Sequence, residues 1–216
     1  MNTRERILRA AGECFAESGF DGASTRQIAE RSGVNKALIH YHFKTKEELF
    51  FGVFDDYYRR LIGALVDSLE LEGTFEQRFA ALIDSYVAFL AANRDLGCVI
   101  QWEASGGKNI ERVVAQMVPL FQRGIELIEE RHPLTKEGDL AASQLLLSFY
   151  GMIVTYFVHT PLFERLLGID PLSDDALQRR KTHLRRMLSI TLQQLELRPP
   201  EPRAPSPSGT EEEPNR

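Results

Sequence analysis

Residues 24–43 decide how this chain folds; they read Ser24-Thr25-Arg26-Gln27-Ile28-Ala29-Glu30-Arg31-Ser32-Gly33-Val34-Asn35-Lys36-Ala37-Leu38-Ile39-His40-Tyr41-His42-Phe43. Ser24 and Gln27 have the spacing of a capping box, so a helix is predicted to begin at residue 25. Gly33 can adopt the positive φ of a tight turn, and Asn35 is a favourable N-cap for a second short helix. Two short helices joined by a sharp turn form a helix-turn-helix, whose second helix enters the major groove of DNA. This spacing alone is common in helical proteins.

The sequence on both sides of this stretch carries further motifs in a fixed order. They are Gly19-Phe20, residues 24–29, residues 33–42, and the run Phe43-Lys44-Thr45-Lys46-Glu47-Glu48-Leu49. Together they resemble the N-terminal domain of the TetR family of transcriptional regulators. The resemblance covers residues 3–50, and beyond residue 50 only the number and length of the helices match.

This resemblance implies contacts to DNA at ten positions. Thr25 and Arg26 match residues that meet phosphate or a groove edge, and Lys46 matches a lysine that binds the DNA backbone. His40 stands where the family most often has a phosphate-binding tyrosine. The leading edge of the recognition helix and the positions that follow are matched by Asn35, Lys36, Ala37, Leu38, Tyr41 and His42.

Other interpretations of these residues stay open. Lys36 is expected to read guanine or to touch phosphate, and the apolar Ala37 and Leu38 can meet a thymine methyl group. Arg26 and Lys46 can also be plain solvated charges. His40 and His42 are two residues apart, about 200° around a helix, so they cannot share one metal ion. No metal site and no cofactor are expected.

The rest of the chain is expected to be helical, because no run alternates as a half-buried strand does. We predict an all-α fold with an N-terminal three-helix helix-turn-helix domain (residues 1–46) and a six-helix domain for effector binding and dimerisation (residues 47–197). Six of the ten prolines lie in residues 198–216, which are predicted to be a disordered tail. The nine predicted helices span 3–18, 25–31, 35–43, 46–69, 75–93, 95–104, 108–131, 137–159 and 173–197.

Residues 140–158 contain no charged side chain, a length that reaches the roughly 18-residue threshold for a membrane span. Ser143, Gln144, Ser148, Gly151 and Thr155 interrupt this segment, and no second hydrophobic segment accompanies it. We therefore expect a helix that is buried in a core or in a subunit interface, and no membrane association.

Charge is distributed unevenly along the chain. The whole sequence has a formal net charge of −5 and a pI near 5.6, which by itself is not typical of a nucleic-acid-binding protein. Residues 1–46, however, hold eight Lys and Arg against five Asp and Glu, a net charge of +3, whereas residues 47–197 carry −7. The basic part of the chain is therefore the part that resembles a DNA reader.

Two cysteines are too few for a disulfide framework or a four-thiolate zinc site, and a reducing cytoplasm is the expected compartment. The first residues contain no apolar stretch typical of a signal peptide. Cys14 is expected to be a small core residue.

The resemblance implies that the second domain binds a small molecule and forms a dimer. The helices at about 137–159 and 173–197 are the expected dimer interface, and the arginines and lysine at residues 179–181, 185 and 186 are expected to form a solvated rim. An apolar pocket among the helices of residues 47–131 would suit a hydrophobic or aromatic effector. Its candidate lining residues, any of which can instead be plain core, are Phe54, Tyr57, Tyr86, Phe89, Cys98, Gln101, Trp102, Met117 and Phe121.

We therefore expect a homodimeric repressor that binds a pseudo-palindromic operator in double-stranded DNA and is released by a small effector. An enzyme is the competing class, but the sequence has no G-x-S-x-G elbow, no glycine-rich phosphate loop and no H-E-x-x-H pair. A helical ligand-binding protein that does not bind DNA is a further alternative. Activation instead of repression also stays open.

Overall fold

The computed structural model describes residues 2–94 and 110–197, and within these ranges every regular element is helical. The prediction of an all-α fold is confirmed. The nine described α-helices and one 3₁₀ turn are α1 Thr3–Gly22, α2 Thr25–Ser32, α3 Lys36–His42, α4 Lys46–Leu69, α5 Phe75–Ala92, α7 Ile110–Arg131, η1 Pro133–Lys136, α8 Ala142–Val158, α9 Thr160–Leu167 and α10 Asp174–Leu197.

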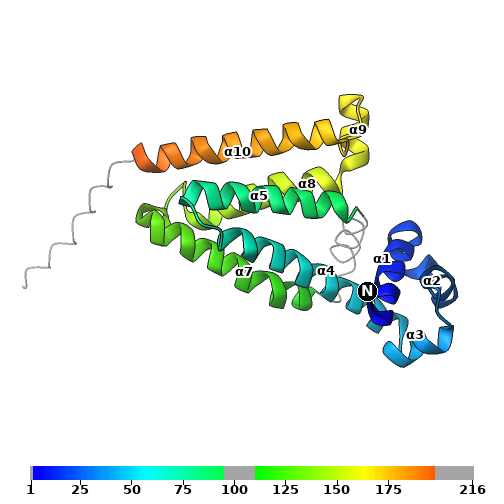
Figure 1. Ribbon diagram of the computed structural model, residues 1–216. Coiled ribbons are helices and arrows are strands. Elements are labelled where there is room, and N and C mark those ends of the chain that lie inside the picture. Colours follow the sequence, from blue (N-terminus) through cyan, green and yellow to red (C-terminus); the bar gives the residue numbers. More distant parts are fainter. Residues whose placement is uncertain (1, 95–109, 198–216) are drawn as a thin grey trace, which may run out of the picture.

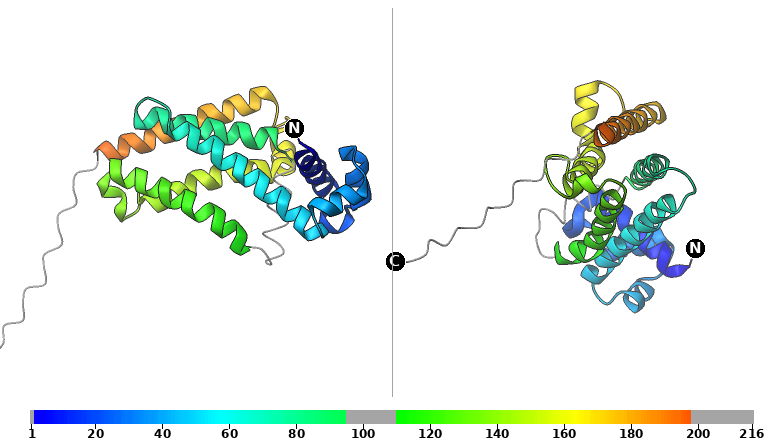
Figure 2. Two further views of the ribbon diagram at one scale, coloured as in Figure 1. Left: turned by 60° about the horizontal axis from the view of Figure 1, so that its bottom comes forward. Right: turned by 90° about the vertical axis from the view of Figure 1, so that its left-hand side faces the viewer.

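The helices are arranged as a small head and an elongated body (Figure 1). The head consists of α1, α2 and α3 at one end of the molecule. The body contains α5, α7, α8 and α10, which run roughly along its length, and α4 leads from the head into it. The two further views in Figure 2 show the same arrangement, with α9 standing across the end of α8.

Helix α4 belongs to both parts, and its burial explains how they are joined. Near its start, Phe50 packs edge-on against the rings of Phe15 and Phe20, with ring centroids 5.2 and 5.4 Å apart. Farther along, Leu61 and Leu65 are buried where α4 packs along α5. One rigid helix therefore connects the core of the head to the core of the body.

Helix starts follow the caps that the sequence contains. The predicted capping box of Ser24 and Gln27 and the cap at Asn35 are confirmed. The first helix is capped by Asn2, whose side chain accepts the backbone N–H of Glu5 while the Glu5 carboxylate accepts that of Asn2. The side chain of Cys14 is buried in the core, as expected.

Helix α9 was not predicted, because Pro161 follows the expected helix of residues 137–159 and proline can mark the end of a helix. Proline is well suited to the first turn of a helix, where its missing N–H would have no partner. The carbonyl of His159 instead accepts the backbone N–H groups of Leu162 and Phe163, and α9 leaves α8 with a bend of 79°. The predicted helix 95–104 lies outside the described residues, so the nine described helices are not the nine predicted.

Two other expectations for this region need correction. Helix α8 begins at Ala142, five residues later than predicted, because η1 and a short turn precede it. Arg180 is not a solvated rim residue, because it donates to the carbonyl of Met152 and stacks on the ring of Tyr156. The Arg185 side chain is 48% exposed, as expected for a rim, but its Nε also donates to Asp84 Oδ1 at 2.9 Å. These two arginines hold α10 against α8 and α5.

Within residues 2–94 and 110–197, none of the helices taken singly is long and apolar enough to cross a membrane. Only α8 and α9 counted together meet that criterion of length and composition, and they are bent at their junction.

Candidate nucleic-acid interface and ligand cavity

The turn between α2 and α3 is held in place by hydrogen bonds from both sides. Gly33 adopts φ 66° and ψ 35°, the left-handed conformation that the sequence predicted, and the Val34 N–H donates to the Ala29 carbonyl at 3.1 Å. From α1, Arg6 Nη2 donates to the carbonyls of Ser32 and Gly33 at 2.7 and 3.2 Å. The turn is therefore fixed to the first helix, and α3 has a defined direction.

Helix α3 presents one polar and aromatic face to solvent. Ile39 is its buried residue, and Leu38 and His42 are half-buried beside it. Lys36, Ala37, His40 and Tyr41 are exposed, and by the 3.6-residue period they span about 140° of the helix surface. The Tyr41 side chain is 72% exposed, which is unusual for a large aromatic residue and leaves its ring open to a partner. We call these four residues the α3 face.

The start of α2, at the opposite end of that helix from the turn, contributes a second exposed cation. Thr25 is half-buried, and Arg26 is exposed, with its Nε 3.1 Å from the Glu30 carboxylate. An exposed ion pair of this kind contributes at most about 1 kcal/mol to stability. The Arg26 guanidinium can therefore exchange Glu30 for a phosphate at small cost.

Lys46 at the start of α4 is partly engaged within the protein. Its Nζ donates to the Asp21 carbonyl at 3.2 Å and lies 4.7 Å from the centroid of the Phe20 ring. Asn35 is exposed, but its side-chain oxygen accepts the Leu38 N–H at 2.8 Å, so its main contact is the cap. These two residues can reach a phosphate only through their remaining donors.

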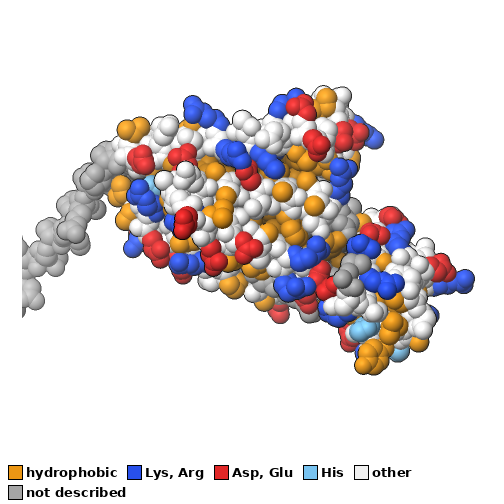
Figure 3. Space-filling model, viewed as in Figure 1, with side chains coloured by type: hydrophobic (Ala, Val, Ile, Leu, Met, Phe, Trp, Pro, Cys, Tyr) orange, Lys and Arg blue, Asp and Glu red, His pale blue; other side chains and the backbone are white. Residues whose placement is uncertain are grey.

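The surface around the α3 face carries mixed charge. Arg31 is bound by both Glu17 oxygens at 2.8 Å, and this ion pair lowers the pKa of Glu17. In Figure 3, hydrophobic and histidine side chains gather at the tip of the head, where α3 lies.

Within the described ranges, no three His, Cys, Asp or Glu side chains come together in a way that could hold a metal ion.

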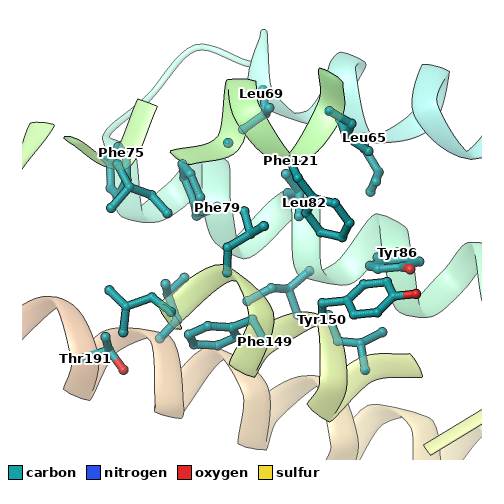
Figure 4. Close-up of a pocket in the computed structure, with 18 of the residues that line it drawn as sticks. Leu65, Leu69, Phe75, Phe79, Leu82, Tyr86, Phe121, Phe149, Tyr150 and Thr191 are labelled. Atoms are coloured by element: carbon teal, nitrogen blue, oxygen red, sulfur yellow. The ribbon is translucent and has the colours of Figure 1, made fainter. Parts of the chain in front are cut away.

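The body encloses an apolar cavity of about 120 Å³ between α4, α5, α7, α8 and α10 (Figure 4). The described residues that line it come from five helices, and none of their side chains is charged. An engineered apolar cavity of about 150 Å³ binds benzene, so this cavity is large enough to hold a small apolar molecule or part of a larger one. The residues that line it are Leu65, Leu69, Phe75, Phe79, Leu82, Ile83, Tyr86, Met117, Leu120, Phe121, Gly124, Ile128, Leu145, Leu146, Phe149, Tyr150, Ile153, Leu188, Thr191, Leu192 and Leu195.

Three of the expected ligand-binding residues, Tyr86, Met117 and Phe121, line this cavity. Phe54 is instead fully buried in the core, and Tyr57 borders a surface hollow between α1 and the ends of α4 and α5. Phe89 lies beside the Arg60 guanidinium, which is 5.7 Å from its ring centroid. Cys98, Gln101 and Trp102 lie outside the described residues.

Sequence reasoning missed the contribution of α8 and α10 to the cavity. Phe149 and Tyr150 on α8 and Thr191 on α10 line it, although both helices were expected mainly at a dimer interface. The sequence did contain an indication of this role for α8, because residues 140–158 carry no charge. A helix that is apolar on all sides can line a cavity with one side and contact a partner with the other.

The fold is a helix-turn-helix head joined by one long helix to an all-helical body with an apolar cavity. The family described as bacterial regulatory proteins, tetR family, matches residues 7–53. The transcriptional repressor AcnR of Corynebacterium efficiens is 42% identical over 53 residues, which cover 24% of this chain and 28% of AcnR. The transcriptional activator FasR of Mycolicibacterium smegmatis is 30% identical over 87 residues, 40% of each chain. Residues 7–53 of this chain are therefore similar to the N-terminal part of tetR-family regulators.

These sequence matches span less than half the length of the curated relatives. Similarity in structure extends farther. FadR from Bacillus subtilis, solved in complex with stearoyl-CoA, aligns with a TM-score of 0.68 at 18% identity, over 85% of this chain and 96% of that one. A transcriptional regulator from Aquifex aeolicus VF5 aligns with a TM-score of 0.67 at 20% identity, over 88% and 99%. At such identities the likeness establishes the fold of head and body together.

Proposed function

We propose that the protein is a homodimeric transcriptional repressor that binds an operator through α2 and α3 and is released by a small apolar effector. The observation that carries this proposal is the α3 face, held outward by a turn that is bonded to α1. An exposed face with one cation, two hydrogen-bonding rings and an apolar residue suits the edges of base pairs and the phosphates beside them.

Each DNA-facing residue has a role that its surroundings support. Lys36, His40 and Tyr41 are free to reach base edges or phosphates, and Ala37 can contact a thymine methyl group. Arg26 and Thr25 lie at the start of α2, where a phosphate would suit them. In this proposal Asn35, Leu38, His42 and Lys46 flank the contact and position the recognition helix.

We place the dimer interface on α8 and α10. Each of these helices exposes a large apolar side chain to solvent: Leu147 on α8 is 56% exposed, and Ile190 on α10 is 38% exposed. A partner subunit could cover both side chains. A two-fold axis would bring the same side chains of both copies together. Two heads related by that axis would then meet successive turns of the duplex, about 34–36 Å apart.

Coupling between effector and DNA would run through α4. The head packs against the first half of α4, while Leu65 and Leu69 near its other end line the cavity. A ligand that widens the cavity would shift this end of α4 and change the separation of the two heads. The coupling then equals the difference in the ligand's affinity for the two separations.

The test is a titration of purified protein against the DNA upstream of its own gene at several salt concentrations. Affinity that falls with rising salt and exceeds the affinity for unrelated DNA supports the proposal. Equal affinity for both DNAs, or none, contradicts it. Turnover of a bound small molecule would instead support the competing interpretation as an enzyme.

A further inference from the structure

The cavity is apolar except for three hydroxyl groups. They belong to Tyr86 on α5, Tyr150 on α8 and Thr191 on α10. The Thr191 hydroxyl donates to the carbonyl of Met187 at 2.8 Å, so its hydrogen is already used. Among the described lining residues, the two phenol groups are therefore the side-chain donors left for a molecule inside the cavity.

The hydroxyls of Tyr86 and Tyr150 lie at the same end of the cavity (Figure 4). Only 7% of Tyr86 is exposed, and across residues 2–94 and 110–197 neither hydroxyl makes a hydrogen bond to another protein group. Burial raises the pKa of both phenols, and the nearby Tyr150 raises that of Tyr86 further, so both stay neutral donors. Among the described residues, neither hydroxyl is one of the fully enclosed side-chain atoms that lack a partner, so each keeps access to open space and can bond a molecule there.

The cavity is long and narrow. Its lining runs from Phe75 to Tyr86 on α5 and from Met117 to Ile128 on α7. At 1.5 Å per residue, each stretch is about 16 Å long. A volume of about 120 Å³ over that length leaves room only for a narrow ligand, such as a single hydrocarbon chain. A wider ligand must push the helices apart.

We propose that the cavity binds an elongated, uncharged molecule with a single polar end group, such as a long-chain alcohol or ketone, and that Tyr86 and Tyr150 hydrogen-bond this end group. The apolar chain extends from the two tyrosines toward Phe75 and Leu195. This inference rests on the proposed function, because it names the class of effector for the same cavity.

The absence of charge in the lining sets the selectivity. A carboxylate or an ammonium group would lose its hydration and find no counter-ion among the lining side chains, a cost that two phenol groups do not offset. An alcohol or a carbonyl needs only one or two hydrogen bonds, and the tyrosine pair supplies them. The cavity therefore selects for a neutral end group.

Calorimetric titration of the full chain with three ten-carbon probes tests this selectivity. The probes are decan-1-ol, decanoate and decylammonium, which differ only in the charge of the end group. We expect decan-1-ol to bind at least tenfold more tightly than either ion. In the double variant Tyr86→Phe/Tyr150→Phe, its affinity should fall about three- to tenfold for each bond lost.

Tyr156→Phe is the matched control, because Tyr156 lies on α8 outside the cavity and its hydroxyl donates to the Pro171 carbonyl at 2.7 Å. Its affinity for decan-1-ol should equal that of the wild type. Binding of decanoate as tight as that of decan-1-ol, no loss in the double variant, or no binding of decan-1-ol overturns the inference. If decan-1-ol binds as expected but leaves DNA affinity unchanged, the inference holds and the proposed release by effector fails.

Discussion

Gly33 is the residue on which the direction of α3 depends. Its φ of 66° is costly for any residue with a Cβ, and an added Cβ would lie 3.0 Å from Arg6 Nη2. We expect Gly33→Ala to lower the free energy of unfolding by about 1–2 kcal/mol. Urea denaturation monitored by circular dichroism measures this change.

Gly63→Ala serves as the control for that substitution. Gly63 lies inside α4 with no atom within 4 Å of the added Cβ, so alanine should raise stability by up to about 1 kcal/mol. Equal effects of the two substitutions would show that the left-handed turn is not the reason for glycine at position 33.

Lys36 is the cation of the α3 face. We expect Lys36→Ala to weaken operator binding. If its partner is a phosphate, the slope of log affinity against log salt should decrease by about one. If Lys36 reads guanine, the slope should change little and discrimination at one base pair should fall by about 1–3 kcal/mol. Fluorescence anisotropy with an operator fragment and single-base variants distinguishes the two.

Arg186→Ala is the control for charge alone, because Arg186 is an exposed cation on α10. It should leave affinity and slope unchanged. A loss as large as that of Lys36→Ala would mean that the overall charge matters, and not the α3 face.

Local patterns in the sequence were reliable for such residues. The capping box of Ser24, the cap of Asn35 and the left-handed Gly33 depend on a few neighbouring residues, and all three were predicted. Arg180 was predicted wrongly, since its contacts with Met152 and Tyr156 depend on how α8 packs against α10. Packing between distant segments leaves no local pattern to read.

At the scale of elements, the difference between local sequence patterns and packing of distant segments also explains why α9 was not predicted. Pro161 signals either the end of one helix or the start of another, and only the bend after α8 decides between them. The cavity was predicted in part, because Tyr86, Met117 and Phe121 lie on expected helices. The wall that α8 and α10 provide could not be foreseen, since helical periodicity does not say which side of an apolar helix faces which neighbour.

The end of α7 gives the body a dependence on pH. The His132 ring packs edge-on against Phe75, 5.5 Å between centroids, and burial together with Arg131 lowers its pKa while Glu196 opposes this. Above pH 6.5 the ring is neutral in both folded and unfolded chains. As pH falls from there through the folded pKa, the unfolded chain binds the proton first, so the stabilising contribution of His132 is lost.

We therefore expect the free energy of unfolding of the wild type to decrease more steeply between pH 7 and pH 5 than that of His132→Gln. Urea titrations at several pH values measure both slopes. Identical slopes would show that protonation of His132 does not oppose folding.

The exposed side of α8 is the element on which the proposed dimer depends. Burying the exposed 56% of Leu147 in both copies would contribute about 2–3 kcal/mol, and a carboxylate there would oppose association, so Leu147→Glu should convert the dimer to monomers. Sedimentation velocity gives the mass directly. Leu71→Glu is the control, because Leu71 is 52% exposed in the connection between α4 and α5. Dissociation by both variants, or by neither, contradicts the assignment of the interface to α8.

For the whole molecule, the net charge of −5 combines a head of +3 with an acidic body. In a dimer, two heads would face the duplex while the bodies point away from it. The acidic surplus limits adhesion to unrelated DNA, so affinity should depend on a few placed contacts. A modest salt slope is expected.

Footprinting of the DNA upstream of the protein's own gene, with and without decan-1-ol, tests the central claim most directly. Two protected half-sites with centres about one helical turn apart, or a multiple of one turn, are expected from a two-fold dimer. Their protection should be lost when the cavity is filled. Protection without two-fold spacing, or no protection at any protein concentration, would contradict the account.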